Sequence, residues 1–152
     1  IPGRLMARLL LLFSCFLLFV PGLALAADYC VDVNSKKGWQ GVTIPNGQIT
    51  RVSFSGGWSV INGIYKPVGP RGYSGKDAKS LGPLYGYKFD QSYAFGEMLV
   101  RDQSGRIVPF AEFSALAVNT RNPAGNYAFR INDLDKALWD NAGVIKVCIS
   151  MR

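Results

Sequence analysis

Side-chain oxygens are concentrated in one short segment near the end of the chain. Five Asp or Asn residues fall within ten positions: Asn132, Asp133, Asp135, Asp140 and Asn141. Calcium takes about six to eight hard oxygen ligands from carboxylates, amides and backbone carbonyls, whereas Asx side chains also form turns without a metal. The segment is not an EF-hand, because Leu138 stands in place of the invariant Gly and Val144 in place of the bidentate Glu. It predicts either a calcium site or a metal-free turn.

The chain contains no histidine. This excludes Ser-His-Asp and Cys-His nucleophile systems, HExxH zinc sites and histidine proton shuttles. Carboxylates remain, but there are only eight Asp and two Glu. Glu97 falls on an expected strand and Glu112 between two expected strands, and no spacing places either of them beside an Asp across a cleft. We therefore predict a binding protein and not an enzyme.

The elements that position these residues follow an N-terminal segment with the features of a cleavable signal peptide. Arg4 and Arg8 precede an apolar run over 9–20, and Ala24-Leu25-Ala26 forms a small-residue cleavage pattern. The apolar run is shorter than the roughly 20 residues that span a bilayer. We expect a signal peptide over 1–26 and an exported domain over 27–152, periplasmic or secreted, without a membrane span. Cleavage would lower the formal charge from +7 to +5.

Cleavage would also remove Cys15 and leave the exported domain with Cys30 and Cys148 alone. An even pair of cysteines in an exported protein is most simply a disulfide. It would tie the first expected strand to the last. Two free buried thiols are the alternative.

Short β-branched and aromatic runs separated by turn residues predict an all-β domain. They cover 29–33, 49–55, 84–89, 97–101, 106–110, 113–118, 126–131 and 144–150. Several alternate: Ile145, Val147 and Ile149 share one face, and Lys146 and Cys148 the other. Eight short strands with Gly- and Pro-rich connections predict a β-sandwich or jelly roll, in which each sheet buries one face against the other.

One connection, over 62–83, is unusually long and combines cations with aromatic rings. Its cations are Lys66, Arg71, Lys76 and Lys79, and its rings are Tyr65 and Tyr73. Such surfaces stack sugar rings or nucleobases and attract anions. No nucleic-acid motif accompanies the charge, so a glycan is favoured over nucleic acid. A solvated loop without a specific function is the alternative.

Several segments resemble the LecA-like (PA-IL-like) bacterial galactose-binding lectins. The most specific is the closing stretch over 129–133, continued by Asp140-Asn141-Ala142-Gly143 and by 144–147, with weaker matches at 38–42, 57–59, 69–72 and 98–101. The resemblance covers about 39–149. It implies a jelly-roll β-sandwich that binds galactose through calcium and often forms tetramers, so it also implies a homo-oligomer.

The resemblance also implies a set of calcium ligands. They are the side chains of Asp133, Asp140 and Asn141 and the backbone carbonyls of Ala137 and of Val60 or Ile61. Two adjacent sugar hydroxyls join the coordination sphere in the family. The chain departs from the family where those lectins present His and Gln to the sugar, because residues 74–79 read Ser-Gly-Lys-Asp-Ala-Lys. This departure argues against galactose itself.

We therefore predict an exported, calcium-dependent carbohydrate-binding protein. The expected sugar contacts, through hydrogen bonds and ring stacking, are Tyr73, Lys76, Asp77 and Trp139. The basic 62–83 segment favours an acidic glycan or a glycoconjugate such as lipopolysaccharide. The alternative is a non-lectin exported interaction or inhibitor protein that uses the 62–83 segment on the same fold against an acidic protein surface.

Overall fold

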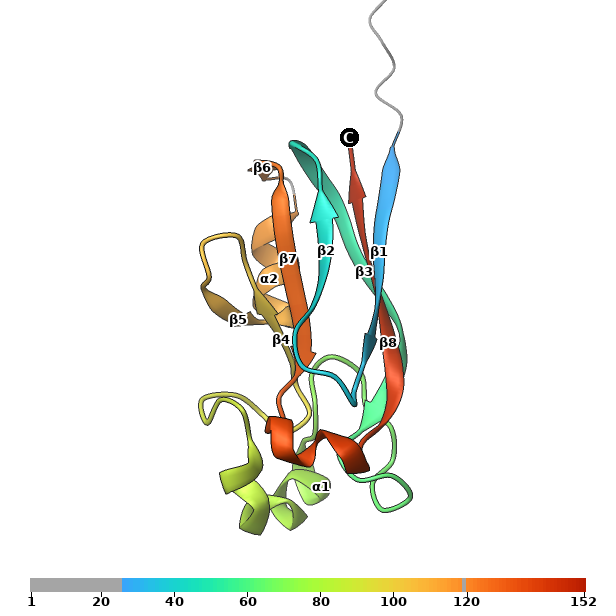
Figure 1. The fold of residues 1–152 in the computed structure, drawn as a ribbon, viewed down its shortest axis with the longest axis vertical. Coiled ribbons are helices and arrows are strands. Elements are labelled where there is room, and N and C mark those ends of the chain that lie inside the picture. Colours follow the sequence, from blue (N-terminus) through green and yellow to red (C-terminus); the bar gives the residue numbers. More distant parts are fainter. Residues whose placement is uncertain (1–25, 119) are drawn as a thin grey trace, which may run out of the picture.

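The computed structural model describes residues 26–118 and 120–152, so residues 1–25 of the expected signal peptide, including Cys15, lie outside the described part. The strands are β1 (Ala27–Asn34), β2 (Gln40–Ile44), β3 (Gly47–Ser59), β4 (Met98–Arg101), β5 (Ile107–Pro109), β6 (Arg121–Asn122), β7 (Gly125–Ile131) and β8 (Ala142–Met151). They form two antiparallel sheets, β1-β8-β3-β6 and β2-β7-β4-β5, that lie face to face (Figure 1). The predicted β-sandwich-like architecture is confirmed.

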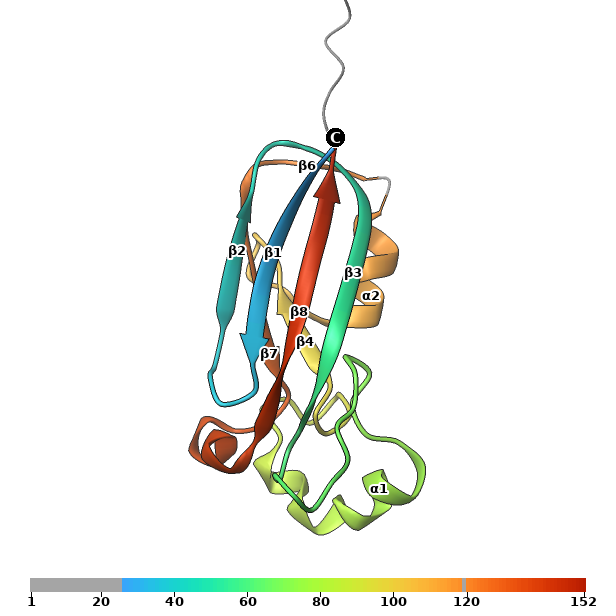
Figure 2. The ribbon, with the colours of Figure 1, turned by 90° about the vertical axis from the view of Figure 1, so that its right-hand side faces the viewer.

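Alternation of apolar and polar residues explains why β8 lies inside the first sheet. Its residues Ile145, Val147 and Ile149 are fully buried, whereas Lys146 between them is exposed. Backbone hydrogen bonds join β8 to β1 on one side and to β3 on the other (Figure 2). From the opposite sheet, the fully buried Phe129 of β7 completes the same core. Burying one apolar face of each sheet in this way holds the two layers together.

The predicted disulfide between Cys30 and Cys148 is confirmed. The two residues lie directly opposite each other in the register of β1 and β8, with their Cα atoms 4.1 Å apart. The bond therefore joins the first strand of the domain to the last. Cys30 is exposed, so the disulfide lies on the outer side of the sheet.

The expectation of a strand over 113–118 is wrong. These residues belong mainly to helix α2 (Phe110–Ala117). Phe110, Phe113 and Ala117 are buried, and this spacing turns one face of a helix towards the core. The Phe113 ring packs on the Tyr127 ring of β7, with the ring centroids 5.1 Å apart.

The expectation of a strand over 84–89 is also wrong, because most of it forms the 3₁₀ helix η1 (Gly82–Tyr87). Pro83 lies in the first turn of η1, where its fixed φ and missing N–H are tolerated. Two strands, β2 and β6, lie outside the eight runs expected from the residue pattern, although the lectin resemblance implies a strand over 38–42, which overlaps β2. β6 has two residues, which is too short to leave an alternating pattern.

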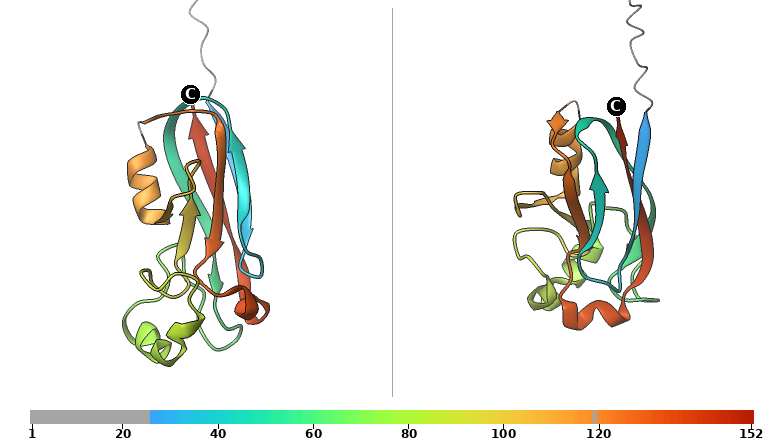
Figure 3. Two further views of the ribbon diagram at one scale, coloured as in Figure 1. Left: turned by 60° about the vertical axis from the view of Figure 1, so that its left-hand side comes forward. Right: turned by 45° about the horizontal axis from the view of Figure 1, so that its top comes forward.

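The 62–83 segment packs against one end of the sandwich and is not an open loop. It contains the short helix α1 (Gly75–Ser80), and Tyr73 and Leu81 are buried. Val68 exchanges two backbone hydrogen bonds with Trp58 at the end of β3. The 3₁₀ helix η2 (Asp135–Asp140), which joins β7 to β8, lies at the same end (Figure 3). No helix in the described residues is long and apolar enough to cross a membrane.

Candidate functional site

A pocket of about 420 Å³ lies at the end of the sandwich where β7 continues into β8. Three parts of the chain form it: the residues after β3, the η1 region with the loop before β4, and η2. Its lining residues are Val60, Ile61, Leu84, Tyr87, Phe95, Asp133, Lys136, Ala137, Trp139 and Asp140. The pocket therefore combines apolar side chains, exposed aromatic rings, two carboxylates and one ammonium group.

Three of the implied calcium ligands carry buried oxygen atoms without a hydrogen-bond partner. They are Oδ1 of Asp133, Oδ1 of Asp140 and Oδ1 of Asn141. In the described part of the chain only one other buried side-chain atom is unpartnered, Oγ of Ser150. The side chains of Asp133 and Asn141 are 1% and 0% exposed. Buried polar atoms normally have partners, so the three unpartnered oxygens around one loop are available to ligate a cation.

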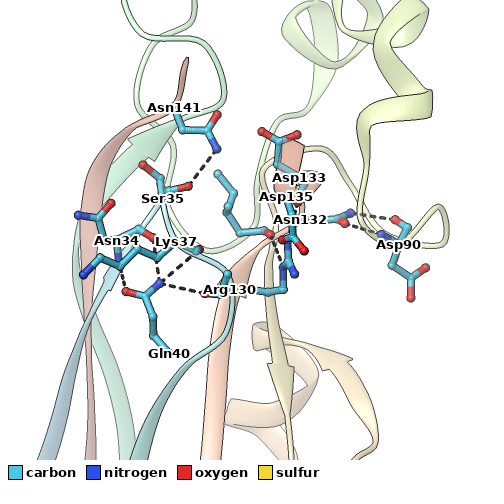
Figure 4. Close-up of polar contacts among 12 residues, drawn as sticks. Asn34, Ser35, Lys37, Gln40, Asp90, Arg130, Asn132, Asp133, Asp135 and Asn141 are labelled. Carbon is cyan, nitrogen blue, oxygen red and sulfur yellow. Dashed lines mark hydrogen bonds and ion pairs between the residues drawn. The ribbon is translucent and has the colours of Figure 1, made fainter. Parts of the chain in front are cut away.

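The other two members of the acidic segment have partners of their own. Asn132 is fully buried and binds the loop before β4, because its amide accepts from Asp90 N–H at 2.8 Å and donates to the Asp90 and Ala94 carbonyls at 2.9 Å each (Figure 4). Asp135 is exposed and pairs with Arg130 at 2.8 Å. The structure thus separates the five Asx residues into two that fix the loop and three that leave oxygens free.

Local contacts explain how Asn141 presents its oxygen. Its side-chain nitrogen donates to the Ser35 carbonyl at 3.0 Å, which fixes the amide orientation and leaves Oδ1 as the free acceptor (Figure 4). Ser35 is itself held by the Gly143 carbonyl, to which its Oγ donates at 3.0 Å. Gly143 has φ +100°, and a Cβ there would overlap the Gly57 carbonyl oxygen of β3. Glycine is therefore required at this position of β8, two residues after Asn141.

Arg130, at the end of β7, holds the start of the loop. Its guanidinium lies over the Phe89 ring, 3.8 Å from the centroid, and is almost completely buried. One of its terminal nitrogens donates to the Asp133 carbonyl at 2.7 Å and to the Asp135 carboxylate at 2.8 Å. The planar fork of arginine suits two acceptors in fixed positions. Arg130 therefore orients the backbone from which the Asp133 carboxylate projects.

Replacing Arg130 by Lys is expected to weaken cation binding at Asp133 by about tenfold, because lysine keeps the charge but lacks the fork that holds the Asp133 carbonyl. Titration with calcium measures the effect. Arg101→Lys is the matched control, since Arg101 lies over the Trp39 ring and makes no contact with the loop in any hydrogen bond or ion pair of the described residues. A loss of thermal stability with unchanged calcium affinity would show that Arg130 supports only the fold.

Burial raises the pKa of Asp133 to about 6. The Asn141 side chain and the Leu134 N–H nearby act against this rise in pKa, and the Asp140 carboxylate adds to it. Burial also raises the pKa of Asp140. Ionising two partly or fully buried carboxylates in one pocket costs free energy unless a counter-charge is present. A bound cation would remove that cost.

The available donors fit a hard cation. In residues 26–118 and 120–152, no three His, Cys, Asp or Glu side chains gather as a metal-binding group. The pocket instead offers two carboxylates, one amide and main-chain carbonyls, a mixed oxygen set that suits calcium. Ile61 and Ala137 both line it. The Ile61 carbonyl accepts from Ile64 and Tyr65 N–H at 3.2 and 3.3 Å, whereas no described backbone N–H donates to the Val60 carbonyl, so Val60 replaces Ile61 as the expected carbonyl ligand.

The four expected sugar contacts do not all lie at the pocket. Trp139 lines the pocket and is 75% exposed. Lys76 and Asp77 are exposed on α1 and do not line the pocket. Tyr73 is buried, and its hydroxyl donates to the Lys66 carbonyl at 3.0 Å. The tyrosine ring is therefore part of the core and is not available to stack on a sugar.

Two pocket residues were not assigned from the sequence, Tyr87 and Lys136. Tyr87 is 44% exposed, and the Lys136 ammonium lies 5.0 Å from its ring centroid. Tyr87 belongs to the 84–89 segment, for which the sequence predicts a strand and not the helix η1. Lys136 is the one cation between Asp133 and Asn141. Its position among the expected calcium ligands is the feature of the sequence that places it near the site.

Neither a family model nor a curated protein matches this chain.

Proposed function

We propose that this is an exported, calcium-dependent carbohydrate-binding protein with a jelly-roll sandwich of the LecA-like type. One observation carries the proposal: the three side chains expected to bind calcium are those that leave buried oxygens unpartnered at one loop. The exposed ring of Trp139 beside them supports a sugar ligand. The confirmed disulfide is compatible with export.

Different residues would bind the ion and the sugar. Asp133, Asp140 and Asn141, with the Ala137 and Val60 carbonyls, would hold the ion. Calcium, when bound, offers coordination positions to neutral sugar hydroxyls, which otherwise compete poorly with water. Trp139 and Tyr87 would stack on the apolar face of the sugar ring, as exposed aromatic side chains do. The apolar side chain of Leu84 would exclude water from the bound ring.

The test has two stages. Calcium is first titrated into metal-free protein by isothermal calorimetry, and a glycan array is then probed with and without chelator. We expect one calcium ion per chain and glycan binding that the chelator abolishes. No calcium binding at millimolar concentrations would overturn the proposal. Chelator-insensitive capture of a single envelope protein would favour the alternative of an interaction protein that uses the 62–83 segment.

Calcium binding is expected to weaken as the pH falls through 6. The pKa of Asp133 is raised to about 6 by burial, and the ion requires the carboxylate form. A proton on this single group gives roughly tenfold weaker binding at pH 5 than at pH 7.5. Calorimetric titrations at the two pH values measure the ratio, and equal affinities would contradict the expectation.

The contribution of Asp133 to the stability of the calcium-free protein is expected to increase as the pH falls, whereas calcium affinity decreases. A carboxyl whose pKa is higher in the folded than in the unfolded state binds its proton more tightly when folded. Its contribution to stability is therefore present below about pH 4 and is lost as the pH rises towards 6. Denaturant unfolding in chelator, compared between wild type and Asp133→Asn, isolates this contribution, and an identical pH dependence in both proteins would contradict it.

A further inference from the structure

We infer that Lys136 binds a negatively charged group on the sugar, so that the ligand of this pocket is an anionic monosaccharide unit carrying a carboxylate or a phosphate. The inference rests on the proposed calcium-dependent sugar binding and names the ligand class of that site. It also moves the acidic-glycan expectation from the 62–83 segment to a residue inside the pocket.

The charges around the pocket support an anionic ligand. The carboxylates of Asp133 and Asp140 match the charge of one calcium ion. The nearby Arg130 is neutralised by Asp135 at 2.8 Å. Lys136 lines the same pocket, and no described Asp or Glu lies within ion-pair distance of it. With the ion bound, the pocket therefore keeps one uncompensated positive charge.

Lys136 is held beside the pocket by a backbone link between the two 3₁₀ helices. The Leu134 N–H donates to the Tyr87 carbonyl at 2.7 Å, and the Ala137 N–H donates to the Leu134 carbonyl at 2.8 Å. Leu138 anchors the same turn in the core. These contacts place the Lys136 ammonium against the Tyr87 ring, 5.0 Å from its centroid. Its position is thus set by the fold, although the side chain itself is exposed.

Other lysines at this end of the molecule do not share this position. Lys88 is buried, and its ammonium donates to the Gln91 and Tyr93 carbonyls at 2.9 and 2.8 Å. Lys76 and Lys79 belong to α1, outside the pocket lining. Lys136 is therefore the pocket-lining cation within reach of a sugar that Trp139 and calcium orient.

The experiment compares matched neutral and anionic sugars in calcium buffer by isothermal calorimetry. The pairs are glucose, galactose and mannose with their uronic acids and with their 6-phosphates, so that the arms distinguish carboxylate from phosphate. We expect at least one anionic member to bind about tenfold more tightly than its neutral partner, with a preference that falls as salt rises. Lys136→Gln should abolish this preference, so that the anionic and neutral members of each pair bind with equal affinity.

Lys79→Gln is the matched control, because it removes an exposed lysine outside the pocket, and it should keep the full preference. Equal binding of all pairs by the wild type, or a preference that survives Lys136→Gln, would overturn the inference and leave calcium-dependent sugar binding intact. Failure of every sugar to bind in calcium would overturn both the inference and the proposed function.

Discussion

Replacing Asp133 by Asn is expected to abolish calcium binding and, at the same time, to stabilise the calcium-free protein. The side chain is 1% exposed, and its Oδ1 has no partner. Substitutions one shell outside a metal site already cost about 10–100-fold in affinity, so loss of this ligand should cost roughly 100-fold or more. Without calcium, removal of a buried charge whose pKa is raised to about 6 should add on the order of 1–3 kcal/mol at pH 7.5.

Calcium titration and denaturant unfolding in chelator measure the two effects on the same samples. Asp77→Asn is the control, because this exposed carboxylate on α1 lies outside the pocket, and it should change neither quantity. A variant at Asp133 that keeps wild-type calcium affinity would remove this residue from the ligand set. Destabilisation of the calcium-free variant would show that the carboxylate has a structural partner.

The second large effect concerns the disulfide. Loss of the bond through Cys30→Ser with Cys148→Ser is expected to lower the free energy of unfolding by about 4–5 kcal/mol, because the bond closes a loop with a sequence separation of 118. Chemical denaturation measures the loss. A thiol reductant should lower the free energy of unfolding of the wild type by a similar amount, since Cys30 is exposed. It should not change the stability of the double variant. A loss below about 1 kcal/mol would contradict the chain-entropy account.

The fold could be predicted from the sequence where side chains alternate in register with the sheet. In β8, Ile145, Val147 and Ile149 point to one face and are buried, so both the strand and its orientation were predictable. The pattern fails in α2, because Phe110, Phe113 and Ala117 lie in a short apolar run that strand and helix can both use. In the structure the helix packs Phe113 on Tyr127 of β7, a tertiary contact that the local pattern does not reveal.

The candidate site was predictable only in its ligand types. Carboxylate and amide side chains in one short segment indicate calcium or a turn, but the sequence does not show which of them already have partners. Asn132 and Asp135 are occupied by contacts with Asp90 and Arg130. Only the tertiary structure shows these contacts. Asp90 lies far from the segment in the sequence, and Arg130 reaches Asp135 from a buried position.

A crystal structure of the protein in millimolar calcium would show directly whether the loop binds an ion. We expect one ion within about 2.3–2.6 Å of Oδ1 of Asp133, Asp140 and Asn141 and of the Ala137 carbonyl oxygen. We also expect open coordination positions that face Trp139. A structure in which these three side-chain oxygens bind protein donors or water, with no ion between them, would contradict the proposed calcium site.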